Sequence, residues 1–187
     1  MENCDKEGLR HALGQFATGV TIVTTAGSND EPIGVTANSF NSVSLDPPMV
    51  LWSLMTSSLS RPAFENAAHF CVHILAVSQE DLSQRFAARG KDKFSGLKWV
   101  RGAGSVPMLE EYVARFQCRM ANQYPVGDHI VFVGEVLHFD RTDKRPLVFH
   151  GGRYALAERR LMEKVARRLG GRAPHRGDRR NRRKPTS

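Results

Sequence analysis

A turn between two alternating segments, near residue 127, most constrains how this chain can fold. Residues 113–124 alternate apolar Phe116, Cys118 and Met120 with polar side chains, which is the period of a strand with one buried face. A Pro-Val-Gly-Asp turn follows at 125–128 and leads directly into the alternating residues 129–139. This pattern predicts strands and places His129 at the first position of one, where a side chain meets solvent or a ligand. A histidine that merely starts a strand is the plain alternative.

The rest of the chain also favours strands over helices. Segments rich in Val, Ile and Thr, separated by Gly, Asn-Asp and Pro-Pro, are residues 19–26, 33–42, 49–54, 69–75 and 147–150. Helical patterns cover residues 9–16, 62–67 and 78–88. Ser78 is expected to open the last of these through a capping box. Residues 89–108 are polar and Gly-rich, which is typical of a long functional loop. We expect a mostly β chain with a few helices, antiparallel, in a closed or split barrel.

Length and cysteine usage limit the class of protein. With 187 residues, the chain is long enough for one domain with a full core and too short for two ordinary ones. The longest apolar runs, such as 130–133, fall far short of the ~20 residues of a membrane span, so we expect a cytoplasmic protein. Cys4, Cys71 and Cys118 form no C-x-x-C pair and are expected to be reduced thiols in or near the core.

The net charge of +8 belongs to the C-terminal end of the chain. From residue 158 onward there are 12 Lys/Arg against 3 Asp/Glu, a balance of +9, which leaves −1 for residues 1–157. We therefore expect a domain over 1–157 and a basic segment over 158–187, consisting of a helix and a disordered Arg-rich tail. The tail is either solvated without function or makes weak, salt-sensitive contact with nucleic acid or an acidic partner. Nucleic acid is not an expected partner of the domain.

Two polar segments have the composition of a nucleotide site. Ser57, Ser58 and Ser60 precede a predicted helix, where hydroxyls and free N–H groups converge on an anion, although serines there also serve as ordinary caps. Residues 36–39, Thr-Ala-Asn-Ser, are small and polar inside a strand pattern. A flat ring could lie against such a backbone, and a bulged edge strand is the alternative.

Other sites are not supported by the sequence. His69 and His73 share a strand face, but no third ligand stands at a recognisable spacing, so no metal site is expected. There is no G-x-S-x-G, no G-x-x-x-x-G-K-[ST] and no G-x-G-x-x-G, because Gly102-Ala103-Gly104 lacks the third glycine. A nucleotide would therefore bind without a Rossmann domain.

The ordered set of segments resembles the flavin reductase-like family, the FMN-binding split barrels that use NAD(P)H to reduce flavin for a partner monooxygenase. The resemblance covers residues 9–154 and includes Gly127-Asp128-His129, Arg85-Phe86-Ala87 and Gly152-Arg153-Tyr154. It implies an antiparallel, Greek-key-like FMN-binding split β-barrel. The sequence departs from the family in its basic tail, in His73, where many relatives carry Asn, and in the bulky Trp52 beside the expected ring site.

The resemblance also implies roles for individual residues. It places the flavin phosphate on Ser58 and Ser60, and the ring along residues 36–39 beside Ser53. It associates Asp128 and His129 with the nicotinamide nucleotide, with His129 as the catalytic candidate that orients it. The residues implied in cofactor binding are Thr36, Ala37, Asn38, Ser39, Ser53, Ser57, Ser58, Ser60, Arg85, Lys93, Phe94, Asp128, His129 and Tyr154.

The implied activity is an NAD(P)H:flavin oxidoreductase acting on FMN or FAD, with the choice between NADH and NADPH left open. A non-catalytic FMN-binding split barrel in electron transfer or flavin storage is the alternative, but it would not need His129 and Tyr154. We also expect a homodimer, in which a second subunit covers Trp52 and Phe94.

Overall fold

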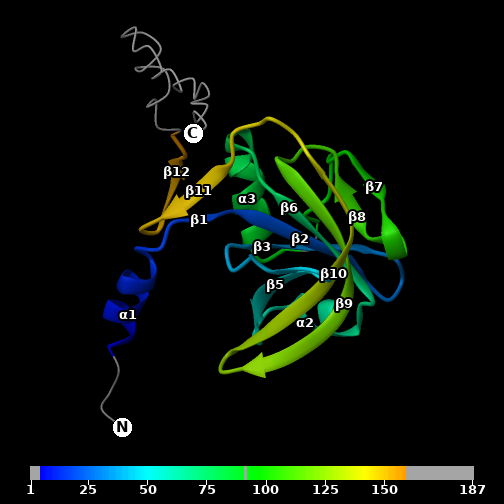
Figure 1. The fold of residues 1–187 in the computed structure, drawn as a ribbon, viewed down its shortest axis with the longest axis horizontal. Coiled ribbons are helices and arrows are strands. Elements are labelled where there is room, and N and C mark those ends of the chain that lie inside the picture. Colours follow the sequence, from blue (N-terminus) through cyan, green and yellow to red (C-terminus); the bar gives the residue numbers. More distant parts are fainter. Residues whose placement is uncertain (1–4, 91, 159–187) are drawn as a thin grey trace, which may run out of the picture. The chain divides into compact units, whose positions relative to one another are not determined.

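The computed structural model describes residues 5–90 and 92–158, and strands dominate it (Figure 1). Seven of them form one sheet in the order β3-β2-β6-β9-β10-β5-β4, and every pair in it is antiparallel. The bounds are β2 Thr21–Ala26, β3 Pro32–Ala37, β4 Asn41–Leu45, β5 Pro48–Met55, β6 His69–Ile74, β9 Ala114–Val126 and β10 His129–Arg141. The expected mostly β, antiparallel fold is confirmed.

Smaller elements surround this sheet. A three-stranded sheet has the order β1-β11-β12, and β7 pairs with β8. These strands are β1 Thr18–Gly19, β7 Trp99–Arg101, β8 Pro107–Leu109, β11 Leu147–His150 and β12 Arg153–Leu156. The helices are α1 Lys6–Leu13, α2 Arg61–Asn66 and α3 Glu80–Ala87, with short 3-10 turns at Val77–Gln79 and Ala103–Ser105. None of the helices in the described part of the chain is long and apolar enough to cross a membrane.

The two edge strands of the large sheet, β3 and β4, follow each other in the chain and are joined only by residues 38–40. So short a link cannot span an open seven-stranded sheet, so the sheet curls until its edges meet. We call the line where the link 38–40 meets β5 the barrel seam. Across this seam, the Ser39 hydroxyl donates to the Ser53 carbonyl (3.0 Å) and accepts the Ser53 N–H (2.9 Å). A side chain thus replaces ladder bonds, and the barrel stays split at this point.

Strands β9 and β10 form a hairpin around the predicted turn. His129 pairs with Val126, so the connection is Gly127-Asp128 alone. Gly127 has a φ of +59°, which the first central position of a primed hairpin turn requires. The prediction that His129 is the first residue of a strand is confirmed.

The interior of the barrel is aromatic. Trp52 is fully buried, with ring centroids 4.8 Å from those of both Phe64 and Phe132. Phe94 is also buried and packs edge-on against Phe86 at 5.0 Å. The expectation that both residues need cover from a second subunit is therefore wrong, and the Trp52 indole points into the core. Alternation along β5 explains this for Trp52, because it turns the indole into the core while the neighbouring Ser53 faces the other way.

Several predicted boundaries also need correction. The first helix begins at Lys6 and not at residue 9, because the Asp5 carboxylate accepts the N–H groups of Glu7 (3.1 Å) and Gly8 (3.0 Å) as an N-cap. The expected strand 33–42 is interrupted at residues 38–40, where the chain crosses the seam. The expected loop 89–108 contains β7 and part of the β7–β8 hairpin, and β12 was not predicted.

Ser78 does not cap α3. Its hydroxyl donates instead to the carboxylate of Glu111 (2.9 Å), which also binds Lys144 (2.9 Å). Buried Gln79 occupies the N-cap position, where its side chain accepts the N–H of Ala76 (2.8 Å). A distant partner has overridden the local capping pattern. The predicted C-terminal helix and tail lie outside the described residues.

Cys71 and Cys118 are buried and unpaired, as expected, while Cys4 lies outside the described residues. Burial raises the pKa of the Cys118 thiol to about 12 and also raises the pKa of Cys71. Both thiols are therefore protonated and unreactive at neutral pH.

His73 is a fully buried, neutral imidazole. Its Nε2 accepts the N–H of Leu109 (3.1 Å), so its Nδ1 carries the proton and donates to the carbonyl of Ile22 (3.1 Å). Burial lowers the pKa of His73 from 6.5 to about 4. A second proton at Nε2 would face the N–H of Leu109, with only the weak sulfur acceptor of Cys71 (3.5 Å) nearby.

We predict that His73 makes the fold sensitive to mild acid. Because its pKa is lower in the folded state, its stabilisation is complete above pH 6.5 and is lost as the pH falls toward about 4. The loss is on the order of 3 kcal/mol. Urea unfolding between about pH 7 and about pH 4.5 measures it, with His73→Asn as the matched variant. An equally steep loss in the variant would assign the acid sensitivity to other groups.

We predict that Ser39→Ala weakens the barrel seam. The substitution leaves the N–H and carbonyl of Ser53 without their partner, which costs about 1–3 kcal/mol in the free energy of unfolding. Chemical denaturation measures this cost. Ser42→Ala, on the exposed strand β4, is the control and should change stability by less than about 0.5 kcal/mol. Equal stability of the two variants would contradict the role of Ser39.

Candidate active site

A cavity of about 400 Å³ lies where the barrel is split. One wall is the end of β3 with residues 38–39. A second wall is the end of β5 with residues 57–60, which we call the serine loop. A third wall is the C-terminal end of α3 with residues 88–90 and 93. His129 completes the cavity. The polar residues that line it are Thr36, Asn38, Ser39, Ser53, Ser57, Ser58, Ser60, Arg89, Lys93 and His129.

The β3 wall offers small side chains and backbone. Ala37 is buried and Asn38 is exposed, while the Ser39 hydroxyl is engaged across the seam. The Thr36 hydroxyl donates to the carbonyl of Ser83 in α3 (2.6 Å). What this wall presents to a ligand is therefore backbone, small surfaces and the Asn38 amide, an arrangement that suits a flat ring.

The serine loop presents hydroxyls that are not used as helix caps. Ser60 is the N-cap residue of α2, yet its side chain makes no capping bond. The Ser58 hydroxyl accepts the N–H of Ser60 (3.3 Å). Ordinary capping, the alternative for these serines, does not account for the Ser60 hydroxyl, and both side chains remain able to donate to an anion.

Lys93 brings a half-buried cation to the cavity. Its ammonium donates to the carbonyls of Phe86 (2.7 Å) and Gly34 (3.4 Å), and burial lowers its pKa. An ammonium has three donors, so one remains for a ligand. Arg89 also lines the cavity and was not predicted. Its position directly after the predicted helix, before Gly90, was the available signal.

His129 stands at the mouth of the cavity with 39% of its side chain exposed. Its Nδ1 lies 2.6 Å from the carboxylate of Asp128, and this hydrogen bond lowers the pKa of Asp128. Asp128 thereby fixes the ring and leaves Nε2 available. The N–H of Thr56 donates to the Asp128 carbonyl (2.9 Å), so the hairpin turn is tied to the start of the serine loop.

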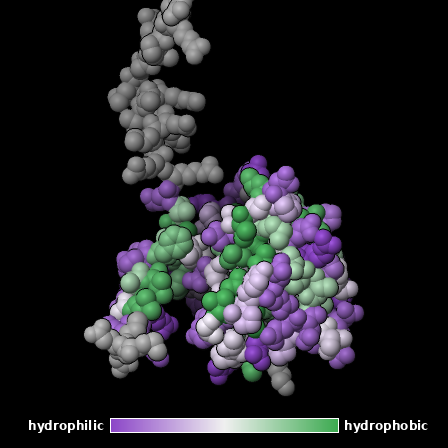
Figure 2. Space-filling view, turned by 60° about the horizontal axis from the view of Figure 1, so that its bottom comes forward, coloured by the Kyte–Doolittle hydropathy of each residue, from purple (hydrophilic) through white to green (hydrophobic). Residues whose placement is uncertain are grey.

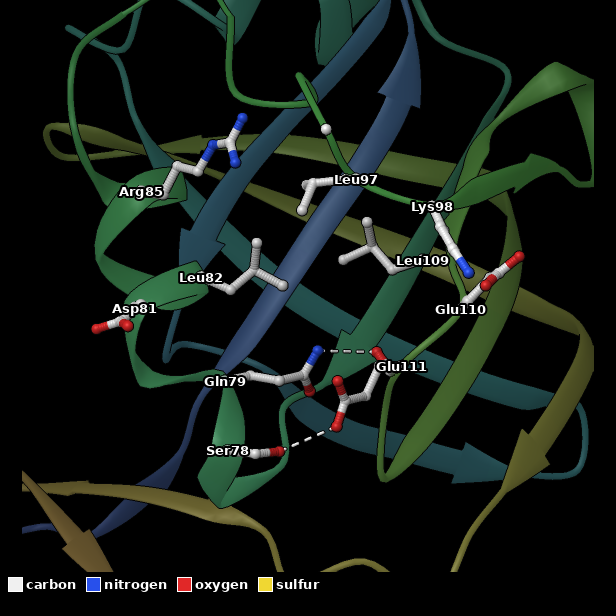
Figure 3. Close-up of a pocket in the computed structure, with 11 residues that line it drawn as sticks. Ser78, Gln79, Asp81, Leu82, Arg85, Leu97, Lys98, Leu109, Glu110 and Glu111 are labelled. Atoms are coloured by element: carbon white, nitrogen blue, oxygen red, sulfur yellow. Dashed lines mark hydrogen bonds between the residues drawn. The ribbon is translucent and has the colours of Figure 1, made fainter.

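Four of the expected site residues do not line the cavity. Asp128 is exposed and bonds His129, and Phe94 lies in the core. The Tyr154 hydroxyl donates to that of Ser83 (2.9 Å) on α3. Arg85 lines a separate cleft on another face of α3, shown in Figure 3. Residues 5–90 and 92–158 contain no group of three or more His, Cys, Asp or Glu side chains able to hold a metal ion.

Comparison with known proteins matches residues 13–158 to the family described as flavin reductase like domain. The FMN reductase (NADH) SmoA of Agrobacterium fabrum is 47% identical over 150 residues, 80% of this chain and 85% of that protein. The reductase component of the flavin-dependent trigonelline monooxygenase of Acinetobacter baylyi is 39% identical over 146 residues, 78% of this chain and 47% of that protein. The match therefore spans about half of the Acinetobacter protein.

A solved structure resembles the fold just described. The NADH:FAD oxidoreductase SgcE6 of Streptomyces globisporus, in complex with NAD and FAD fragments, superposes with a TM-score of 0.78 at 37% identity. The superposition covers 82% of this chain and 93% of SgcE6. Sequence, fold and the cavity at the barrel seam agree, and the chain belongs to the flavin reductase like domain family.

Proposed function

We propose that the protein is an NADH-dependent flavin reductase that reduces FMN and supplies reduced flavin to a partner monooxygenase. The observation that carries this proposal is the cavity at the barrel seam, in which small residues, free serine hydroxyls, a cation and His129 converge. The family and the names of the relatives support the same activity.

The residues present fit a flavin mononucleotide. Ser58, Ser60 and Lys93 have donors left over after their contacts within the protein, and Arg89 adds a second cation, a set that suits a phosphate. Residues 36–39 and Ser53 offer the flat, small surface that a ring needs. When bound, the flavin supplies the ring that accepts a hydride from the nicotinamide.

His129 acts by position in this proposal. Its Nδ1 proton is held by Asp128, and its ring stands at the cavity mouth, where it can orient a nicotinamide nucleotide through Nε2 and its flat face. Hydride transfer needs no proton relay through this imidazole. Asp128 contributes by holding the His129 ring in place. Tyr154 contributes by bonding Ser83, which holds α3 in place.

The proposal includes a cytoplasmic location, which suits the free thiols of Cys71 and Cys118. It also includes a homodimer. Helix α1 buries none of its residues, and Leu13 and Phe16 are 68% and 77% exposed. Figure 2 shows hydrophobic surface on this part of the molecule, at the left of the view. Apolar side chains gathered on one helix and its end favour an interface.

The activity is tested by the oxidation of NADH and NADPH with FMN, FAD or riboflavin as acceptor. We expect NADH to be oxidised with FMN. Flavin binding without any oxidation of either nucleotide would favour the non-catalytic carrier.

His129→Ala should impair the use of NADH and spare flavin binding. Loss of one hydrogen bond and some stacking suggests about ten- to a hundredfold in kcat/KM, with some activity left because the imidazole is not an obligatory acid. Stopped-flow reduction at several NADH concentrations measures it, with flavin affinity measured separately. The control is His138→Ala, exposed on the same strand. Unchanged kinetics in His129→Ala would leave this histidine without a role in the reaction.

Replacing Ser58 and Ser60 together by Ala should weaken FMN binding selectively. Each hydrogen bond to a charged group contributes about 1.5–3 kcal/mol to binding. Riboflavin has no phosphate, so the double substitution removes no such bond from its complex. Dissociation constants for both ligands measure the difference. Equal losses for FMN and riboflavin would mean that the serines only shape the loop.

Leu13→Asp should shift the protein from dimer to monomer, because a carboxylate would be desolvated in the interface. Light scattering measures the mass. The control is Val100→Asp, an exposed apolar residue on β7. A wild-type protein that is monomeric with full flavin affinity would contradict the homodimer.

A further inference from the structure

Arg85 is a cation that bonds backbone carbonyls. It stands in the last turn of α3, and its Nη2 donates to the carbonyls of Ser95 (2.6 Å) and Asp92 (3.3 Å). Within the described part of the chain, no carboxylate forms an ion pair with it. Figure 3 shows the side chain reaching from α3 toward the segment that carries Leu97, away from Asp81.

The turn that Arg85 holds contains Lys93. Within this turn, residues 92–95, the Asp92 carboxylate accepts the N–H of Ser95 (2.9 Å) and so closes the turn. Arg85 binds carbonyls at both ends of this turn, so it sets the position of the turn relative to α3. The Lys93 ammonium then returns to α3 at the carbonyl of Phe86 (2.7 Å), the residue next to Arg85.

These contacts connect two faces of one helix. Arg85 lines a cleft of about 480 Å³ that has Leu82, Leu97 and Leu109 along it, whereas Phe86 and Ala87 line the active-site cavity together with Lys93. An ammonium on a flexible stem holds one position only if its backbone is held. Both bonds come from the two hydrogens of Nη2, and the planar guanidinium fixes their directions.

We propose that Arg85 is a positioning residue for phosphate recognition: it fixes the turn 92–95 so that the free donor of Lys93 faces the flavin phosphate. The inference rests on the proposed function, which places the phosphate at Lys93 and the serine loop. Arg85 itself does not touch the ligand. Its contribution should therefore be present for FMN, absent for riboflavin, and dependent on Lys93.

The test is a double-mutant cycle read on two ligands. Dissociation constants for FMN and riboflavin are measured by fluorescence quenching for wild type, Arg85→Met, Lys93→Met and the double variant, with thermal melting as the folding check. We expect Arg85→Met to weaken FMN about tenfold and riboflavin less than about twofold. The double variant should bind FMN no more weakly than Lys93→Met alone.

Two further variants separate positioning from charge and from stability. Lys98→Met removes a cation that lines the same cleft, and it should leave both constants unchanged. Arg85→Lys keeps the charge but loses the planar group that directs the two Nη2 bonds, so it should keep only part of the FMN affinity. If Arg85→Met does not fold, Arg85→Lys and Arg85→Gln carry the same cycle.

The outcomes distinguish the inference from the function beneath it. Equal losses of affinity for FMN and riboflavin in Arg85→Met would overturn the positioning role, as would additive losses of FMN affinity in the cycle. A loss in Lys93→Met that is selective for FMN would still uphold the phosphate site. If Lys93→Met itself shows no preference between the ligands, the phosphate is not at Lys93, and the inference fails with that part of the proposed function.

Discussion

The link of residues 38–40 between the two edge strands controls both the fold and the site. An open sheet of seven strands would leave β3 and β4 far apart, so a three-residue connection is possible only in a closed barrel. Closure is not completed by a backbone ladder, because Ser39 satisfies Ser53 with its hydroxyl instead. Where a ladder is replaced by one side chain, a gap remains between strands, and the cavity is in this gap.

The opposite wall of the cavity depends on close packing of α3 against β3. Any Cβ at Gly34 would collide with the ring of Phe86, so the helix approaches the strand at a distance that only glycine allows. Thr36 then bonds the Ser83 carbonyl of α3, and Lys93 bridges the two elements by donating to the carbonyls of Gly34 in β3 and Phe86 in α3. Tyr154 holds the same helix from β12. Residues distant in the chain thus fix a helix whose end lines the cavity.

Period and turn chemistry were enough to predict much of the fold. The turn at Gly127-Asp128 and the strand beginning at His129 follow from local sequence, because glycine and alternation act within a few residues. The side taken by Trp52 did not follow, since apolar residues occupy both faces of β5 and only the assembled barrel decides which is inside. Ser78 was misassigned for a similar reason: its partner, Glu111, is 33 residues away.

The candidate site shows the same division. Short motifs placed Ser58, Ser60, residues 36–39 and His129, each set by its own segment, and the structure brings them to one cavity. The helix predicted over residues 78–88 already put Arg85 inside the helix and Arg89 after it, but only the structure shows that the segment after the helix lines the cavity. The helix ends at Ala87, so Arg89 lies in the cavity lining and Arg85 does not.

The distribution of these groups also bears on how a flavin could be held and released. Contacts at a phosphate do not change when the ring is reduced, so Lys93 and the serines would bind both forms alike and set how long either stays. In the proposed function, only the wall at 36–39 and His129 contact the reacting parts of the ligands, the flavin ring and the nicotinamide. A reductase that must give up its product gains rate from this second set alone, because uniform binding at the phosphate lowers KM without raising kcat.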